Sequence, residues 1–112
     1  MKPFSKACEN NKLPILNVIS SFFSAGGDVF EIGSGTGQHA VFFANNLPAI
    51  RWHTSDLIEN HVGIVEWIQE SMLPNVIFPI ELDVVSGIWP KNIFDGVFTA
   101  NTCHIMHWHE VV

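Results

Sequence analysis

The sequence DVFEIGSGTGQHA at positions 28–40 decides the fold of this chain. Its first five residues, 28–32, favour a short strand, and the apolar residues after it are spaced as on one face of a helix. Between them, Gly33, Gly35 and Gly37 let the backbone turn sharply and let a ligand lie against the main chain. A tight turn without a ligand is the alternative, but three glycines at alternate positions are an unusual cost for a turn alone. We therefore predict a ligand-binding loop.

The spacing of the glycines narrows the class of ligand. The dinucleotide fingerprint is GxGxxG or GxGxxA, and Gln38 stands where its last small residue belongs. A phosphate-binding P-loop is excluded because no GK[ST] follows. The loop favours a ligand without phosphate that approaches the backbone closely. The stretch from Glu31 to Gly37 resembles motif I of class I methyltransferases, whose cofactor is S-adenosylmethionine.

Outward from this loop, helical and extended segments alternate along the chain. We expect a helix at 14–24 with Pro14 in its first turn, a strand at 28–32, a helix at 40–47, a strand at 50–55, a helix at 56–72, strands at 76–80 and 94–100, and a tail at 101–112 that enters another helix. Pro79 places the third strand at a sheet edge, because proline cannot donate to a ladder. This alternation predicts βαβ units in one α/β domain over 1–112, with a Rossmann-like, three-layer α/β/α fold and a mainly parallel sheet.

An acidic residue follows the second expected strand. Asp56 lies about 20 residues beyond the glycine loop, where Rossmann folds place the acid that binds ribose. A carboxylate at this position can accept hydrogen bonds from both ribose hydroxyls. The segment from Asp56 to Glu59 is also typical of a helix N-cap with a capping-box glutamate, and the two roles can coexist.

Polar residues also follow the fourth expected strand, at the edge where open α/β sheets place their reacting groups. Asn101 is a candidate contact to cofactor or substrate, and His104 is a candidate base near neutral pH. Cys103 together with His104, His107 and His109 suggests a metal site. The usual ligand spacing is absent, so packing or capping histidines are favoured and no metal is predicted. The other histidines are interpreted as structural: His39, His53 and His61.

Composition limits the partner and the location. The 112 residues are 47% hydrophobic and 14% charged, with a formal net charge of −6. The five basic residues are scattered, which disfavours nucleic acid as a partner. No apolar run is typical of a secretory signal or reaches the roughly 18 residues of a membrane span. Two cysteines are too few for a disulfide framework. We expect a cytoplasmic protein with a small-molecule or protein partner and no contact with a membrane.

Taken together, these motifs resemble the family named after methyltransferase-like protein 26, almost from end to end of the chain. The similar stretches are 5–16, 31–40, 54–56, 82–84, 89–90 and 101–108. Asn10 and the pair Met106 and His107 depart from the family pattern, on the side expected to face the substrate.

The resemblance implies an S-adenosylmethionine-dependent methyltransferase that acts on a small-molecule acceptor. It assigns the cofactor's methionyl end to the loop residues Glu31, Gly33, Ser34, Gly35, Gly37 and Gln38, its ribose to Asp56 and Leu57, its adenine side to Asp83 and Val84, and the methyl and acceptor side to Asn101 and His104, the two catalytic candidates. Taken alone, Asp83 is more typical of a turn.

The same resemblance implies that the domain is incomplete. Class I methyltransferases have a seven-stranded sheet in the order 3-2-1-4-5-7-6, and this chain supplies its first four strands. Without strand five, the fourth strand would present an apolar edge with Phe94, Val97 and Phe98, which invites pairing with another chain. We therefore expect a homodimer through this edge, or a truncated protein. The alternative function is a non-catalytic module that binds cofactor or dimerises.

Overall fold

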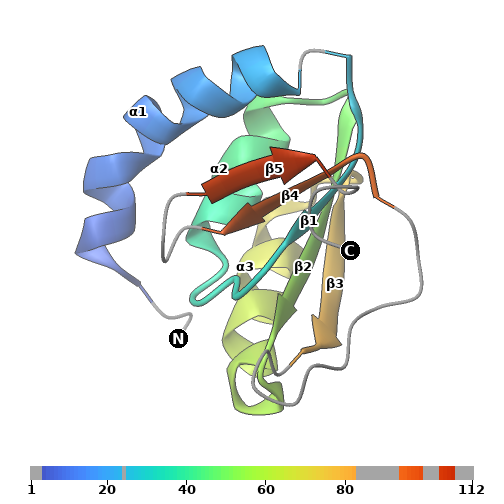
Figure 1. Cartoon of the computed structure of the whole chain (residues 1–112). Coiled ribbons are helices and arrows are strands. Elements are labelled where there is room, and N and C mark those ends of the chain that lie inside the picture. The colour runs from blue at the N-terminus through green and yellow to red at the C-terminus, as the bar shows by residue number, and fades with distance from the viewer. Residues whose placement is uncertain (1–3, 24, 83–93, 100–103, 108–112) are drawn as a thin grey trace.

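The computed structural model describes residues 4–23, 25–82, 94–99 and 104–107, which form a five-stranded sheet in the order β3-β2-β1-β4-β5 (Figure 1). The strands are β1 (Gly27–Glu31), β2 (Ile50–Asp56), β3 (Val76–Glu81), β4 (Gly96–Thr99) and β5 (His104–His107). The helices are α1 (Lys6–Phe22), α2 (Gln38–Asn46) and α3 (His61–Ser71), with a short 3-10 helix, η1 (Ile58–Asn60), before α3.

The first four strands are parallel. β1 pairs with both β2 and β4, and β2 pairs with β3. The chain passes through α2 between β1 and β2, and through η1 and α3 between β2 and β3. Parallel neighbours need such long crossovers, because a tight turn can only join antiparallel strands. The predicted Rossmann-like α/β fold with a mainly parallel sheet is confirmed.

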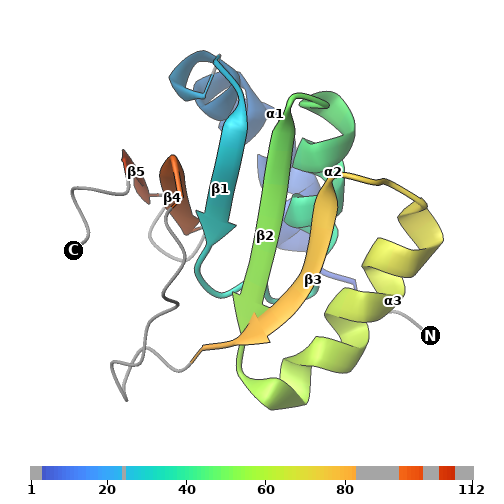
Figure 2. The same ribbon diagram turned by 90° about the vertical axis from the view of Figure 1, so that its right-hand side faces the viewer.

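The main core lies on one face of the sheet, which α1, α2 and α3 cover (Figure 2). At its centre the rings of Phe43, Trp52 and Phe98 contact one another, with centroids 5.4 to 5.7 Å apart. These rings come from α2, β2 and β4, so their packing fixes the helix against the sheet. A smaller cluster on the opposite face joins Phe30, Leu82 and Phe94.

The first helix begins eight residues earlier than the sequence predicts. Ser5 is its N-cap, and the Ser5 hydroxyl accepts a hydrogen bond from the backbone N–H of Cys8. Pro14 therefore lies inside the helix, and its predicted place in the first turn is wrong. Apolar spacing marks only the C-terminal half, where Ile19 packs into the core, because the first turns are polar and more exposed. Across the described ranges, no helix is long and apolar enough to cross a membrane.

The proline in β3 occupies the edge position that the sequence predicts. β3 is the outermost strand on its side of the sheet. Its register with β2 shifts between the pairs His53–Ile77 and Ser55–Ile80, so one extra residue is accommodated around Pro79. A bulge on an edge strand removes the need for a ladder hydrogen bond at the proline nitrogen.

The tail of the chain corrects two predictions. The residues from 104 to 107 form β5, antiparallel to β4, where the sequence predicted a loop entering a helix. β4 is therefore not an edge strand, since Val97 pairs with Met106 and Phe98 with Ile105. The unpaired backbone groups of β4 are satisfied by the chain's own next segment, which periodicity cannot reveal. The homodimer predicted through an exposed β4 edge loses this support.

An ion-pair cluster ties the beginnings of β1 and β2 together. The Asp28 carboxylate accepts hydrogen bonds from the Arg51 guanidinium and from His53 Nε2, each at 2.7 Å from Oδ1. Asp95, just before β4, joins the cluster, because its carboxylate accepts from the Asp28 backbone N–H at 2.7 Å. The Arg51 hydrogen bond lowers the pKa of Asp28 to about 2, against a smaller opposing effect of burial.

We expect Asp28→Asn to lower the free energy of unfolding by about 1 kcal/mol at pH 7, the scale of a partly exposed ion pair. Because the folded-state pKa of Asp28 is depressed, its stabilising contribution is present above the ordinary aspartate pKa and is lost as pH falls toward about 2. Urea unfolding followed by tryptophan fluorescence at pH 7 and pH 2.5 measures the difference. Glu59→Gln on the exposed η1 surface is the control, and an equal loss at both pH values would exclude a charge effect.

Candidate functional site

The loop between β1 and α2 has the backbone that the glycine spacing predicts. Gly33, Gly35 and Gly37 have φ angles of 70°, 61° and 95°, in the left-handed region that other residues rarely adopt. At Gly37, an added Cβ would lie 3.1 Å from the Ile64 Cα and 3.3 Å from the Trp67 Cβ, so this glycine lets α3 pack against the loop. At Gly35 an added Cβ would meet no atom of the described residues within 4 Å, apart from its two neighbours in the chain.

Two serines fasten this loop to β2. The Ser34 backbone N–H donates to the Ser55 carbonyl at 2.7 Å, and the Ser34 hydroxyl accepts from the Ser55 N–H at 3.0 Å. The Ser55 hydroxyl in turn donates to the Glu31 carbonyl. Both serines are buried, so the Ser34 side chain holds the loop against β2 and does not face solvent.

Asp56 lies directly against the glycine loop. Its Oδ2 accepts a hydrogen bond from the Gly35 N–H at 2.8 Å. Its Oδ1 accepts from the Leu57 N–H at 2.7 Å and from the Asn60 side-chain amide at 2.8 Å. The structure thus brings together the loop and the acid that the sequence singled out separately. Leu57 is next to them and is 39% exposed.

The capping role considered for Asp56 is not formed. α3 begins at His61 rather than at residue 56, and its N-cap is Asn60, without a side-chain cap hydrogen bond. The Asp56 side chain serves the loop and η1 instead, while His61 Nε2 lies 2.9 Å from the Asp56 carbonyl oxygen. The interpretation of Asp56–Glu59 as a capping box is therefore wrong.

Glu31 is the most deeply buried acid described in this structure, with 1% of its surface exposed. Its Oε1 accepts a hydrogen bond from the Trp52 indole N–H at 3.0 Å. Burial raises the pKa of Glu31 to about 7, and the negative charge of Asp56 acts in the same direction, while hydrogen bonds from Trp52 and Ser34 oppose them. The carboxyl therefore titrates near neutral pH.

Gln38 is bound by the beginning of α1. Its Nε2 donates to the Ser5 carbonyl at 3.2 Å and to Glu9 Oε2 at 3.1 Å, and its Oε1 accepts from the Thr36 hydroxyl at 3.0 Å. The Ser5 N–H also donates to this Oε1. Sequence reasoning missed this connection because its partners are 29 and 33 residues away along the chain. The contact predicted between Gln38 and a cofactor stays a prediction.

His39 is a buried histidine that sequence reasoning placed among structural residues. Its ring stacks on Phe43, with centroids 5.1 Å apart and planes within 6°. Burial lowers the pKa of His39, so the ring is neutral at pH 7. Its Nδ1 is the one buried side-chain nitrogen or oxygen, within the part of the chain described, that has no hydrogen-bond partner. No sequence signal points to this orphan nitrogen.

Several candidates cannot be placed. Asp83, Val84 and Asn101 lie outside the described residues, and for His104 only the backbone, at the beginning of β5, is described. Among the residues that the structure does describe, no three histidine, cysteine, aspartate or glutamate side chains gather as metal ligands would. These candidates remain predictions.

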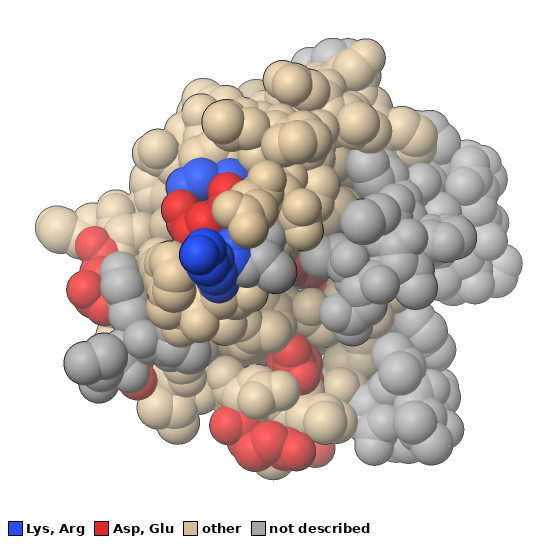
Figure 3. Space-filling model, turned by 90° about the vertical axis from the view of Figure 1, so that its left-hand side faces the viewer, with Lys and Arg blue, Asp and Glu red and all other residues tan. Residues whose placement is uncertain are grey.

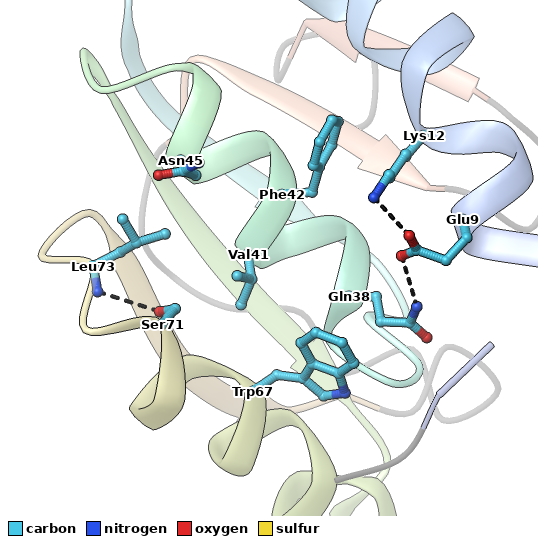
Figure 4. Close-up of a pocket in the computed structure, with 9 residues that line it drawn as sticks. All are labelled: Glu9, Lys12, Gln38, Val41, Phe42, Asn45, Trp67, Ser71 and Leu73. Atoms are coloured by element: carbon cyan, nitrogen blue, oxygen red, sulfur yellow. Dashed lines mark hydrogen bonds and ion pairs between the residues drawn. The ribbon is translucent and has the colours of Figure 1, made fainter. Parts of the chain in front are cut away.

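A separate pocket of about 340 Å³ lies on the outer side of α2, between α1 and α3 (Figure 4). Its lining is Glu9, Lys12, Gln38, Val41, Phe42, Asn45, Trp67, Ser71 and Leu73. Only Gln38 is shared with the predicted loop, so this pocket is not the space beside Gly35.

The surface around α1 carries few basic side chains, and these lie beside acidic ones (Figure 3). One such pair is Lys12 and Glu9, which form an ion pair at 2.6 Å.

The two glycines give a matched test of loop strain. We expect Gly37→Ala to lower the free energy of unfolding by about 2–3 kcal/mol, because it combines a strained φ with a clash against α3. Gly35→Ala adds a methyl group to open space and should cost only about 1 kcal/mol, from the φ angle alone. Urea unfolding of both variants measures the difference. Equal losses would contradict the tight packing of the loop against α3.

Several methyltransferases of known structure are similar to this chain. Among solved structures, the chain is similar to the S-adenosylmethionine-dependent methyltransferase SibL (TM-score 0.69, 22% identity, 80% of this chain and 26% of that one). It is also similar to coclaurine N-methyltransferase bound to N-methylheliamine and SAH (0.64, 17%, 88% and 30%). A third similar structure is the O-methyltransferase TomG from Streptomyces achromogenes in complex with SAM (0.57, 19%, 87% and 44%).

These likenesses establish the fold, a Rossmann-like fold shared with methyltransferases. The chain spans less than half the length of each of these structures. A family model described as "Protein of unknown function (DUF938)" matches residues 2–112. The chain therefore belongs to the DUF938 family.

Proposed function

We propose that this chain is the S-adenosylmethionine-binding part of a class I methyltransferase that acts on a small-molecule acceptor. The observation that carries the proposal is the contact between Asp56, at the end of β2, and the Gly35 amide of the loop after β1. In a Rossmann-like sheet, the carboxyl ends of adjacent strands are where nucleoside ligands bind. Coclaurine N-methyltransferase and TomG, which share the fold, are described with SAH and SAM bound.

The residues present fit such a cofactor. Apart from the two neighbours of Gly35 in the chain, no described residue lies within 4 Å of a Cβ built on this glycine, so the described residues leave room for a ligand to approach the main chain there. Beside it, the Asp56 carboxylate accepts two hydrogen bonds at Oδ1 and one at Oδ2, so Oδ2 has a further lone pair that can accept from a ribose hydroxyl. No lysine or arginine lies between Glu31 and Gln38, which suits a ligand without phosphate.

The proposed roles of the residues combine their places in the chain with the resemblance to class I methyltransferases. When bound, S-adenosylmethionine supplies a methyl group made electrophilic by its sulfonium, so the protein has mainly to orient the reactants. Asp56 and Leu57 would hold the ribose, and Glu31 with the 33–38 loop would hold the methionyl end. The remaining roles come from resemblance and from chain order: Asp83 and Val84 on the adenine side, and Asn101 and His104 on the acceptor side.

The proposal also covers the size of the acceptor and the location of the protein. Coclaurine N-methyltransferase is described with N-methylheliamine, a small molecule, which supports an acceptor of that size. We also propose that the chain is related to the family named after methyltransferase-like protein 26 and that it is cytoplasmic.

A second candidate is a non-catalytic module that binds the cofactor or a partner without turnover. The chain spans 26% to 44% of the methyltransferases compared above, and the observed contact between Asp56 and Gly35 concerns cofactor binding rather than methyl transfer. In such proteins the later strands commonly complete the substrate site. Binding of cofactor without methyl transfer would identify this candidate.

We expect S-adenosylhomocysteine to bind the purified chain with micromolar affinity, measured by isothermal titration calorimetry. Asp56→Ala should weaken this binding about tenfold to a hundredfold, because charge-assisted hydrogen bonds contribute about 1.5–3 kcal/mol. The control is Glu59→Gln, an exposed acid in η1. A folded wild-type chain that binds neither S-adenosylhomocysteine nor S-adenosylmethionine would contradict the proposed cofactor site and favour the module that only associates.

A further inference from the structure

The carboxyl group of Glu31 has an environment that the proposed function does not yet explain. It is 1% exposed, on the helix-covered side of the sheet, beside the fully buried Trp52. Its hydrogen-bond donors are the Trp52 indole, at 3.0 Å, and Ser34, both of which are neutral. A buried carboxylate is costly unless a cation or several donors compensate it.

The groups around Glu31 provide no such cation among the residues that the structure describes. From β2 the charge that acts on it is Asp56, which is also negative. From β4 its neighbour in the sheet is the apolar Phe98. From α2 the titratable side chain is His39, whose charged neighbours are Glu9 and Lys12 of α1. Glu31 is therefore held by neutral donors and repelled by an acid.

A proton compensates this carboxyl in the free protein. Burial, the largest effect, raises the pKa of Glu31 to about 7, so near neutral pH the group is partly protonated. Glu31 lies two residues before Gly33, and its carboxyl is hydrogen-bonded to Ser34 of the glycine loop, where the proposed cofactor would bring a sulfonium and an ammonium group. A positive charge at this loop favours the ionised carboxyl over the protonated one.

We propose that Glu31 is a positioning residue that exchanges its proton for the positive charge of the cofactor, so that binding of S-adenosylmethionine releases a proton to the solvent. The proposal rests on the proposed function, since it needs a cationic ligand at the loop. It goes beyond that function by assigning the loop a preference for cations and a pH dependence. Trp52 contributes to this proton exchange, because its indole N–H stabilises the ionised form of Glu31.

The size of the effect follows from linkage. With a Glu31 pKa of about 7 in the free protein and a fully ionised carboxyl in the complex, binding should release about half a proton per cofactor at pH 7 and about 0.9 at pH 6. Because binding releases protons, affinity should rise with pH, by about fivefold from pH 6 to pH 7.

Calorimetric titration of the wild-type chain in buffers of different ionisation enthalpy counts these protons directly. S-adenosylmethionine and S-adenosylhomocysteine are titrated side by side at pH 6, 6.5 and 7, where the α-amino group of each ligand is mostly protonated. Both ligands carry the ammonium group, and only S-adenosylmethionine carries the sulfonium. Release with both ligands identifies the ammonium as the partner of Glu31, and release with S-adenosylmethionine alone identifies the sulfonium.

Variants then assign the proton to Glu31. Glu31→Gln keeps the shape and a hydrogen-bond acceptor for Trp52 but cannot ionise, so proton release and the pH dependence of affinity should both disappear. Glu70→Gln, an exposed acid on α3, should leave both unchanged. Trp52→Phe removes the indole donor, which should raise the pKa of Glu31 and increase release at pH 7 from about half a proton toward one. Circular dichroism checks that each variant is folded.

The outcomes separate this inference from the proposed function. Cofactor binding without proton release between pH 6 and pH 7 overturns the role of Glu31 and leaves the cofactor site intact. Proton release that persists in Glu31→Gln also overturns it, because another group must then titrate. If Glu31→Gln does not fold, the wild-type proton count and its increase in Trp52→Phe decide. Failure of both ligands to bind overturns the proposed function itself.

Discussion

The candidate site depends above all on the hydrogen bonds that hold the glycine loop against the end of β2. Ser34 and Ser55 exchange two of them, and the Gly35 N–H donates to Asp56. The loop backbone lies outside the helix and strand ladders at these residues, so its polar groups need other partners. β2 provides them. The same bonds place a carboxylate beside an open stretch of main chain, so the stability of the loop and the chemistry of the site have one origin.

The position of Glu31 follows from core packing in a similar way. Trp52 fills the centre of the core between Phe43 and Phe98, and a buried indole needs an acceptor for its N–H. The Glu31 carboxyl is that acceptor. The ring that fixes α2 and β4 to the sheet therefore also fixes the acid in front of the loop, and neither residue can be changed without affecting the other.

The sequence predicts features that are local, and it misses those that depend on distant partners. The glycine loop and Asp56 are predictable because strand, turn and acid follow one another at fixed spacing, and a parallel sheet brings their ends together. β5 is not predictable in this way, since its pairing depends on β4 having a free edge. The same holds for Gln38, whose partners Ser5 and Glu9 lie on α1, and for the early start of α1, whose first turns carry no apolar pattern.

Glu31 and Asp56 show how one site separates the behaviour of two carboxyl groups. Asp56 is only partly buried and accepts three hydrogen bonds from N–H groups. Glu31 is buried, and its pKa is raised mainly by this burial and also by the charge of Asp56, which favours the neutral form. An anionic ligand such as a pyrophosphate would bring negative charge beside these two acidic side chains, and no lysine or arginine in the 31–38 segment would offset it. A cationic ligand would interact favourably with both carboxyl groups. Electrostatics therefore favour the same choice as the glycine spacing, against a dinucleotide and for a sulfonium cofactor.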